Sequence, residues 1–237
     1  MLHFLCFNEQ EFSVLLSAFE IDSVVCFEED NVISFSQEDY DQGLFSLNKR
    51  GLINRMKGAD TFDISSECKQ IFNVIKKSNN MLLLECKDKK IPQYAIYSFE
   101  RDYVIISPGT RDGEYVRVSG MDEKELIVFI EDSGLLAESY GVDGDEKMGL
   151  LPFTDKDYEF FLKEHPIPED EGLYSYSNVK FRAMNMENGT GEVKETTVVL
   201  EQHLQSKMIC VSQKKDTVIE PYSLEGVIEE IIRMMED

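Results

Sequence analysis

The most constraining feature of this sequence is an order of segments that occurs twice. In each half an amphipathic helical segment precedes about four short segments with strand character, and another amphipathic helical segment follows them. Short strands separated by turn residues indicate an antiparallel sheet, and helices with one apolar face are suited to cover it. The sequence therefore predicts an α+β fold, with an antiparallel sheet of about four strands flanked by helices in each half.

Three helices are predicted ahead of the first sheet. The first spans 8–19, the second follows a Ser36 cap and ends at Gly51, and the third is capped by Ser65 or Ser66. Their apolar residues recur at helical spacing: Phe12, Leu15, Leu16 and Phe19; Tyr40, Leu44 and Leu47; Cys68, Ile71, Phe72 and Ile75. With an extended link at 58–64, these helices also fit a winged helix.

An antiparallel meander and a helix complete the first half. The predicted strands are 81–86, 93–99, 103–107 and 115–119, joined by short links with turn chemistry. The segment 122–132 follows. Its centre, 126–130, is apolar on all sides, so helix and buried strand compete there, and the acidic start at Asp122 and Glu123 favours a helix.

The second half repeats this order after a segment rich in glycine and acidic residues at 140–150. A helix capped by Thr154 ends before His165-Pro166, and Asn188-Gly189 is a hairpin signal. The predicted strands are 173–184, 193–200, 207–212 and 217–221, and Ser223 caps a final helix. We expect an N-terminal subdomain at 1–139, a linker at 140–150 and a C-terminal subdomain at 151–237. The repeated order fits a duplication, and it also fits coincidence because the halves share little identity.

The charge of the chain argues against nucleic acids and anionic membranes as partners. The 237 residues include 46 Asp and Glu against 24 Lys and Arg, for a net charge of -22. Such a charge repels a phosphate backbone or an anionic membrane surface. It fits either a need for solubility or the capture of a basic protein partner. The hydrophobic share of 42% is enough for a folded core.

No catalytic, cofactor-binding or metal-binding residue is predicted. The three histidines, His3, His165 and His203, stand apart from other ligands, and 107–113 lacks a phosphate-binding pattern. The acidic 143–146 segment lacks the oxygen pattern of a calcium loop. Five cysteines at irregular spacing predict reduced core residues: Cys6, Cys26, Cys68, Cys86 and Cys210. The start of the chain has no basic flank or cleavage-type site, and no apolar run is long enough to span a bilayer, so we expect a cytoplasmic protein.

Residues 9–136 resemble the EspG-type proteins that serve mycobacterial ESX (type VII) secretion, and more closely their counterparts in Gram-positive bacteria of low genomic GC. The segments that carry the resemblance are EFSVLLSAF, DQGLFSLNKRGLINR, SSECKQIFNVIKK, MLLLECKDKKIPQYAIYSFERDYVIISPGTRDGEYVRV and MDEKELIVFIEDSGLL. The C-terminal half agrees in element order. The resemblance implies two similar α+β subdomains related by a pseudo-twofold axis, and a cytosolic chaperone that holds secretion substrates before export.

Three functions follow from these observations. The first is a non-catalytic adaptor or chaperone that binds a type VII secretion substrate. The second is an immunity protein whose acidic surface neutralises a secreted toxin. The third is a winged-helix regulator built on 9–80, against which the net charge argues. No substrate-contact residue carries over from the resemblance, so the partner-binding residues are not predicted.

Overall fold

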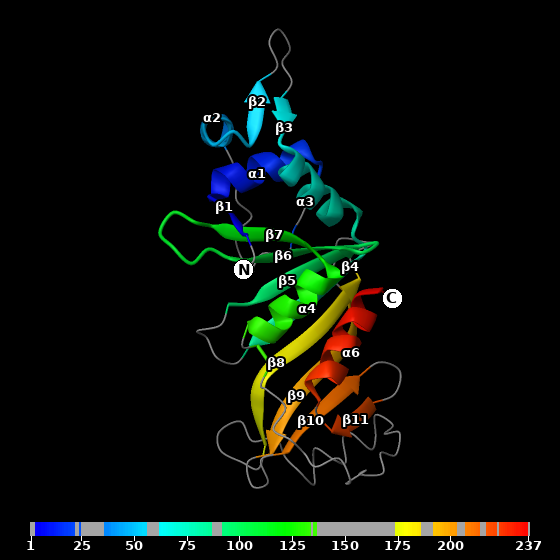
Figure 1. Ribbon diagram of the computed structural model, residues 1–237. Coiled ribbons are helices and arrows are strands. Elements are labelled where there is room, and N and C mark those ends of the chain that lie inside the picture. The colour runs from blue at the N-terminus through cyan, green and yellow to red at the C-terminus, as the bar shows by residue number, and fades with distance from the viewer. Residues whose placement is uncertain are drawn as a thin grey trace. The chain divides into compact units, whose positions relative to one another are not determined.

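The computed structural model shows an α+β protein whose residues divide into two compact units (Figure 1). Unit 1 comprises Met1–Asn79 and Gln93–Leu126, and unit 2 comprises Asn80–Pro92 and Ile127–Asp237. The α+β class predicted from the sequence is confirmed. The structure describes residues 3–21, 24, 36–55, 62–86, 92–133, 135–136, 174–185, 192–202, 207–213, 217–221 and 223–236.

Unit 1 combines three helices with four neighbouring antiparallel strands in the order β1-β7-β6-β5. The strands β2 and β3 pair in a separate two-stranded sheet. The elements are β1 (Leu5–Phe7), α1 (Glu9–Ala18), α2 (Gln37–Lys49), β2 (Ile53–Arg55), β3 (Phe62–Ile64), α3 (Ser66–Lys77), β5 (Tyr94–Phe99), β6 (Asp102–Pro108) and β7 (Val116–Asp122). The helix α3 packs on β5, β6 and β7.

The three helices begin at side chains suited to that position. Asn8 and Ser36 form capping boxes with Glu11 and Asp39, and the Ser65 hydroxyl accepts from the Cys68 amide. The hydrogen bonds from Ser36 lower the pKa of the Asp39 carboxyl. The predicted caps at Ser36 and Ser65 are confirmed.

A cluster of phenylalanines forms the centre of unit 1. Phe7, Phe12 and Phe72 are almost fully buried, with ring centroids 5.9–6.3 Å apart. They come from β1, α1 and α3 respectively, and Phe19 stacks on Phe72 at 5.4 Å. Each buried aromatic side chain contributes roughly 1.5–3 kcal/mol. Three separate elements of the sequence are thus held together by one apolar cluster.

A buried carboxylate joins α1 to α2. Glu11 is 3% exposed, and it accepts hydrogen bonds from the Ser46 hydroxyl and the Arg50 guanidinium, both at 2.6 Å. Arg50 also lies over the Phe7 ring, 5.4 Å from its centroid. Gly43 brings the two helices into backbone contact, since a Cβ there would lie 2.6 Å from the Gln10 carbonyl oxygen. The Glu11–Arg50 ion pair and the close backbone contact at Gly43 therefore hold α1 and α2 together.

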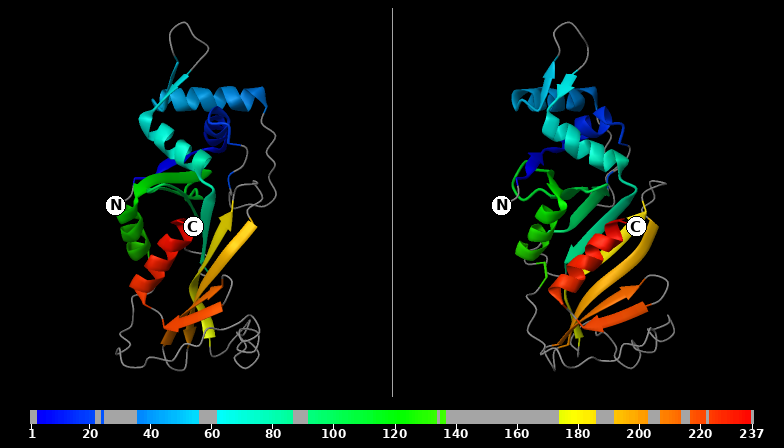
Figure 2. Two further views of the ribbon diagram at one scale, coloured as in Figure 1. Left: turned by 90° about the vertical axis from the view of Figure 1, so that its right-hand side faces the viewer. Right: turned by 45° about the vertical axis from the view of Figure 1, so that its right-hand side comes forward.

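Unit 2 contains five antiparallel strands, which neighbour one another in the sheet in the order β4-β8-β9-β10-β11. The strands are β4 (Asn80–Cys86), β8 (Tyr174–Asn185), β9 (Glu192–Gln202), β10 (Lys207–Gln213) and β11 (Thr217–Pro221). The helix α6 (Leu224–Glu236) lies along this sheet and contacts β4 and β8 (Figure 2). The C-terminal sheet is thus completed by a strand from the first half of the sequence.

The buried face of α6 is close to the predicted one. The Ser223 hydroxyl accepts from the Gly226 amide, which confirms this cap. The residues buried on this helix are Val227, Ile228, Ile231, Met234 and Met235. Leu224 and Ile232, which the apolar stripe also includes, are half-buried.

The helix α4 (Glu123–Asp132) resolves the ambiguity of its apolar centre. Asp122 and Glu125 exchange hydrogen bonds with each other's backbone amides, so a capping box starts the segment as a helix. Leu126 and Ile130 are fully buried, whereas Val128 is 52% exposed. The helical prediction at 122–132 is confirmed.

Other predictions differ from the structure or fall outside it. The four C-terminal strands form as expected, but β1 and β2, each of three residues, are too short for a period-two pattern to predict. The linker at 140–150, the Thr154 helix and the Asn188-Gly189 turn lie outside the described residues. The division into 1–139 and 151–237 stays a prediction.

We predict that Gly43→Ala destabilises the protein by about 1–3 kcal/mol, because the added methyl group meets the rigid backbone of Gln10. Helix propensity alone would give the opposite sign, about 1 kcal/mol of stabilisation. Urea denaturation at low protein concentration measures the change. Asn48→Ala, an exposed substitution on the same helix, is the control, and an equally stable or more stable Gly43→Ala variant would contradict the close contact.

Candidate functional site

The side chains with metal-binding chemistry do not converge in the part of the chain that the structure describes. There, no group of three or more His, Cys, Asp and Glu side chains is placed to hold a metal ion. His3 Nδ1 lies 3.6 Å from a Glu67 carboxylate oxygen, with the two side chains 80% and 52% exposed. His165 and His203 lie outside the described residues. The expectation that the chain carries no metal site stays a prediction.

The pKa values of two described thiols are shifted upward, whereas a catalytic cysteine has a lowered pKa. Cys6 and Cys68 are free thiols, half-buried and buried respectively. Burial raises the pKa of both, and Glu114 raises that of Cys6 further. A nucleophilic cysteine needs a lowered pKa, because the thiolate is the reactive form. Neither residue is therefore poised for nucleophilic catalysis.

The loop at 107–113 is a hairpin connection, as the sequence predicts. The Gly109 amide donates to the Tyr115 carbonyl at 2.9 Å, and Gly113 has a φ of 82°. The Glu114 carboxylate accepts from the Thr110 amide at 3.3 Å. In a phosphate-binding loop the backbone amides are free to bind the ligand, whereas here the Thr110 amide is bound by the Glu114 carboxylate of the chain itself.

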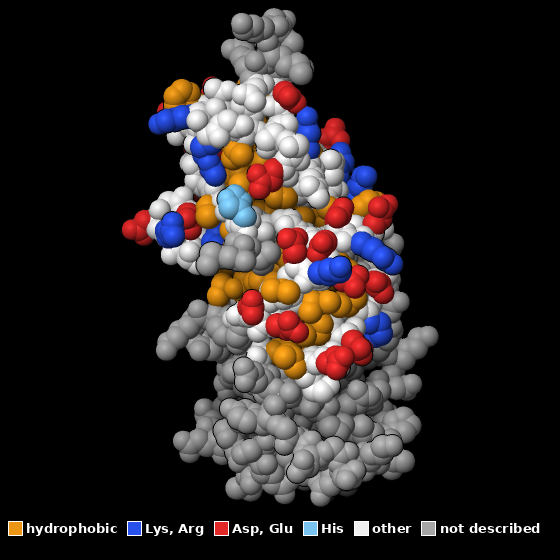
Figure 3. Space-filling model, in the orientation of Figure 1, with side chains coloured by type: hydrophobic (Ala, Val, Ile, Leu, Met, Phe, Trp, Pro, Cys, Tyr) orange, Lys and Arg blue, Asp and Glu red, His pale blue; other side chains and the backbone are white. Residues whose placement is uncertain are grey.

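The basic side chains of α3 are engaged within unit 1. Lys69 pairs with Asp63 at 2.7 Å and Lys76 with Glu20 at 2.9 Å. Lys77 lies over the Phe99 ring, 4.8 Å from its centroid. On the face shown in Figure 3, basic and acidic side chains are intermixed over the described residues. This arrangement does not provide the basic stripe that a DNA-binding helix requires.

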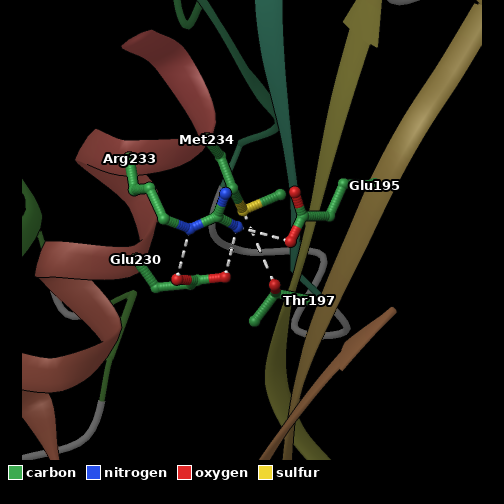
Figure 4. A network of polar contacts seen from close by, with 5 residues as sticks. All are labelled: Glu195, Thr197, Glu230, Arg233 and Met234. Atoms are coloured by element: carbon green, nitrogen blue, oxygen red, sulfur yellow. Dashed lines mark hydrogen bonds and ion pairs between the residues drawn. The ribbon is translucent and has the colours of Figure 1, made fainter. Parts of the chain in front are cut away.

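A network of polar contacts fastens α6 to β9 (Figure 4). Arg233 points from the helix toward the strand, and its guanidinium pairs with both Glu195 and Glu230. Glu230 binds it through two hydrogen bonds, at 2.8 and 2.6 Å. The Thr197 hydroxyl donates to the Met234 sulfur at 3.5 Å. The carboxylates hold the pKa of Arg233 above its ordinary value, so the guanidinium stays charged.

This network is a structural feature. Glu195 is 5% exposed, so its charge requires a partner, and Arg233 provides one. Because both carboxylates bind the same guanidinium, they are not arranged as the acid and the base of a catalytic pair. These residues were not predicted from the sequence. One local signal was available, since Glu230 and Arg233 have the i, i+3 spacing of an ion pair on a helix.

Comparison with solved structures identifies a protein of similar fold. Most of the present chain, 99%, superposes on 96% of the EspG5 chain, with a TM-score of 0.52 and 11% sequence identity. That structure is of the Mycobacterium tuberculosis type VII secretion system chaperone EspG5 in complex with the PE25-PPE41 dimer. The chain has an EspG5-like fold. No protein-family model and no curated protein sequence matches the chain.

The likeness extends over both units. The resemblance seen in the sequence covers 9–136, whereas the structural match covers almost the whole of both chains. At this level of identity the match shows the fold, and it assigns no partner-binding residue.

Among the described helices, none has the length and hydrophobicity to cross a membrane.

We predict that Arg233→Met destabilises the protein by about 1–3 kcal/mol, because it leaves the buried Glu195 carboxylate without its arginine. The range allows for the partial exposure of the arginine, 37%. Adding Glu195→Gln should recover part of the loss, since it removes the buried charge. Chemical denaturation measures both changes.

Glu229→Ala, an exposed change on the same helix, is the matched control and should stay within about 0.5 kcal/mol of the parent protein. A Glu195→Gln change that adds its full cost to that of Arg233→Met would show that the two residues are not coupled.

Proposed function

We propose that this protein is a non-catalytic cytosolic chaperone or adaptor that binds a type VII secretion substrate. The observation that carries the proposal is the near-complete mutual coverage of this chain and EspG5, 99% and 96%. The fold of a secretion chaperone accounts here for nearly all of both chains.

The chemistry of the described residues supports this proposal. Their thiols have raised pKa values, and the buried carboxylates Glu11 and Glu195 are each paired with an arginine. Such groups stabilise a scaffold, and protein binding then depends on surface shape and charge. We extend the proposal to a pseudo-twofold relation between subdomains at 1–139 and 151–237, and to a place among the EspG-type proteins of low-GC Gram-positive bacteria.

Affinity purification from the native host tests the proposal. The chromosomal copy is tagged, and proteins that copurify at the natural expression level are identified by mass spectrometry. We expect at least one exported helical-hairpin or toxin protein. An untagged strain and a strain with an unrelated tagged acidic protein are the controls.

Deletion of the gene provides the functional measurement. The copurifying protein should disappear from the culture medium and be restored by the intact gene. If no exported protein copurifies and the secreted proteins are unchanged by the deletion, the chaperone function is wrong.

The charge favours an immunity protein as a second candidate. The exposed side of α6 carries the carboxylates of Glu225, Glu229 and Glu236, in a chain with a net charge of -22. An acidic surface speeds the capture of a basic partner, and the association rate then falls steeply with salt. Rescue of cells from a cognate toxin would support this function, and failure to rescue would exclude it.

A further inference from the structure

We draw no further inference here: the strongest candidate, the apolar outer side of α4 around Val128, which is 52% exposed beside the half-buried Ile127 and Phe129, carries none because nothing in the described residues shows what covers it.

Discussion

The pairing of β4 with β8 is the constraint on which the rest of unit 2 depends. It joins Leu82 to Ala183 and Leu84 to Phe181, across about 100 residues of sequence, and all four side chains are buried. Because side chains alternate between the faces of a sheet, a slip of one residue would turn these groups to the opposite face. Closing so long a loop is entropically unfavourable and slow, so the pairing must be stabilised by burial of the apolar face. The C-terminal strands therefore complete their sheet only with a strand from the first half.

Each unit also contains one buried glutamate bound to an arginine that is only partly buried. In unit 1 Glu11 on α1 is bound by Arg50, and in unit 2 Glu195 on β9 is bound by Arg233. In both cases the arginine side chain is 35–37% exposed and reaches inward from a helix, so the guanidinium keeps contact with water while it neutralises the carboxylate. Such pairs add little net stability over apolar packing, but the loss of one partner is costly. Their main effect is to fix which face of α2 and of α6 points inward.

The helices were predictable from local signals, and the strand partners were not. Ser36, Ser65 and Ser223 start helices because a hydroxyl satisfies a free backbone amide, which is a property of a few adjacent residues. Period-two alternation identifies a strand and its faces, but it carries no information on which strand will be the neighbour. The pairing of β4 with β8 and the three-residue β1 therefore emerge only in the structure. The capping role of Glu11 could have been predicted, since Asn8 and Glu11 have the spacing of a capping box.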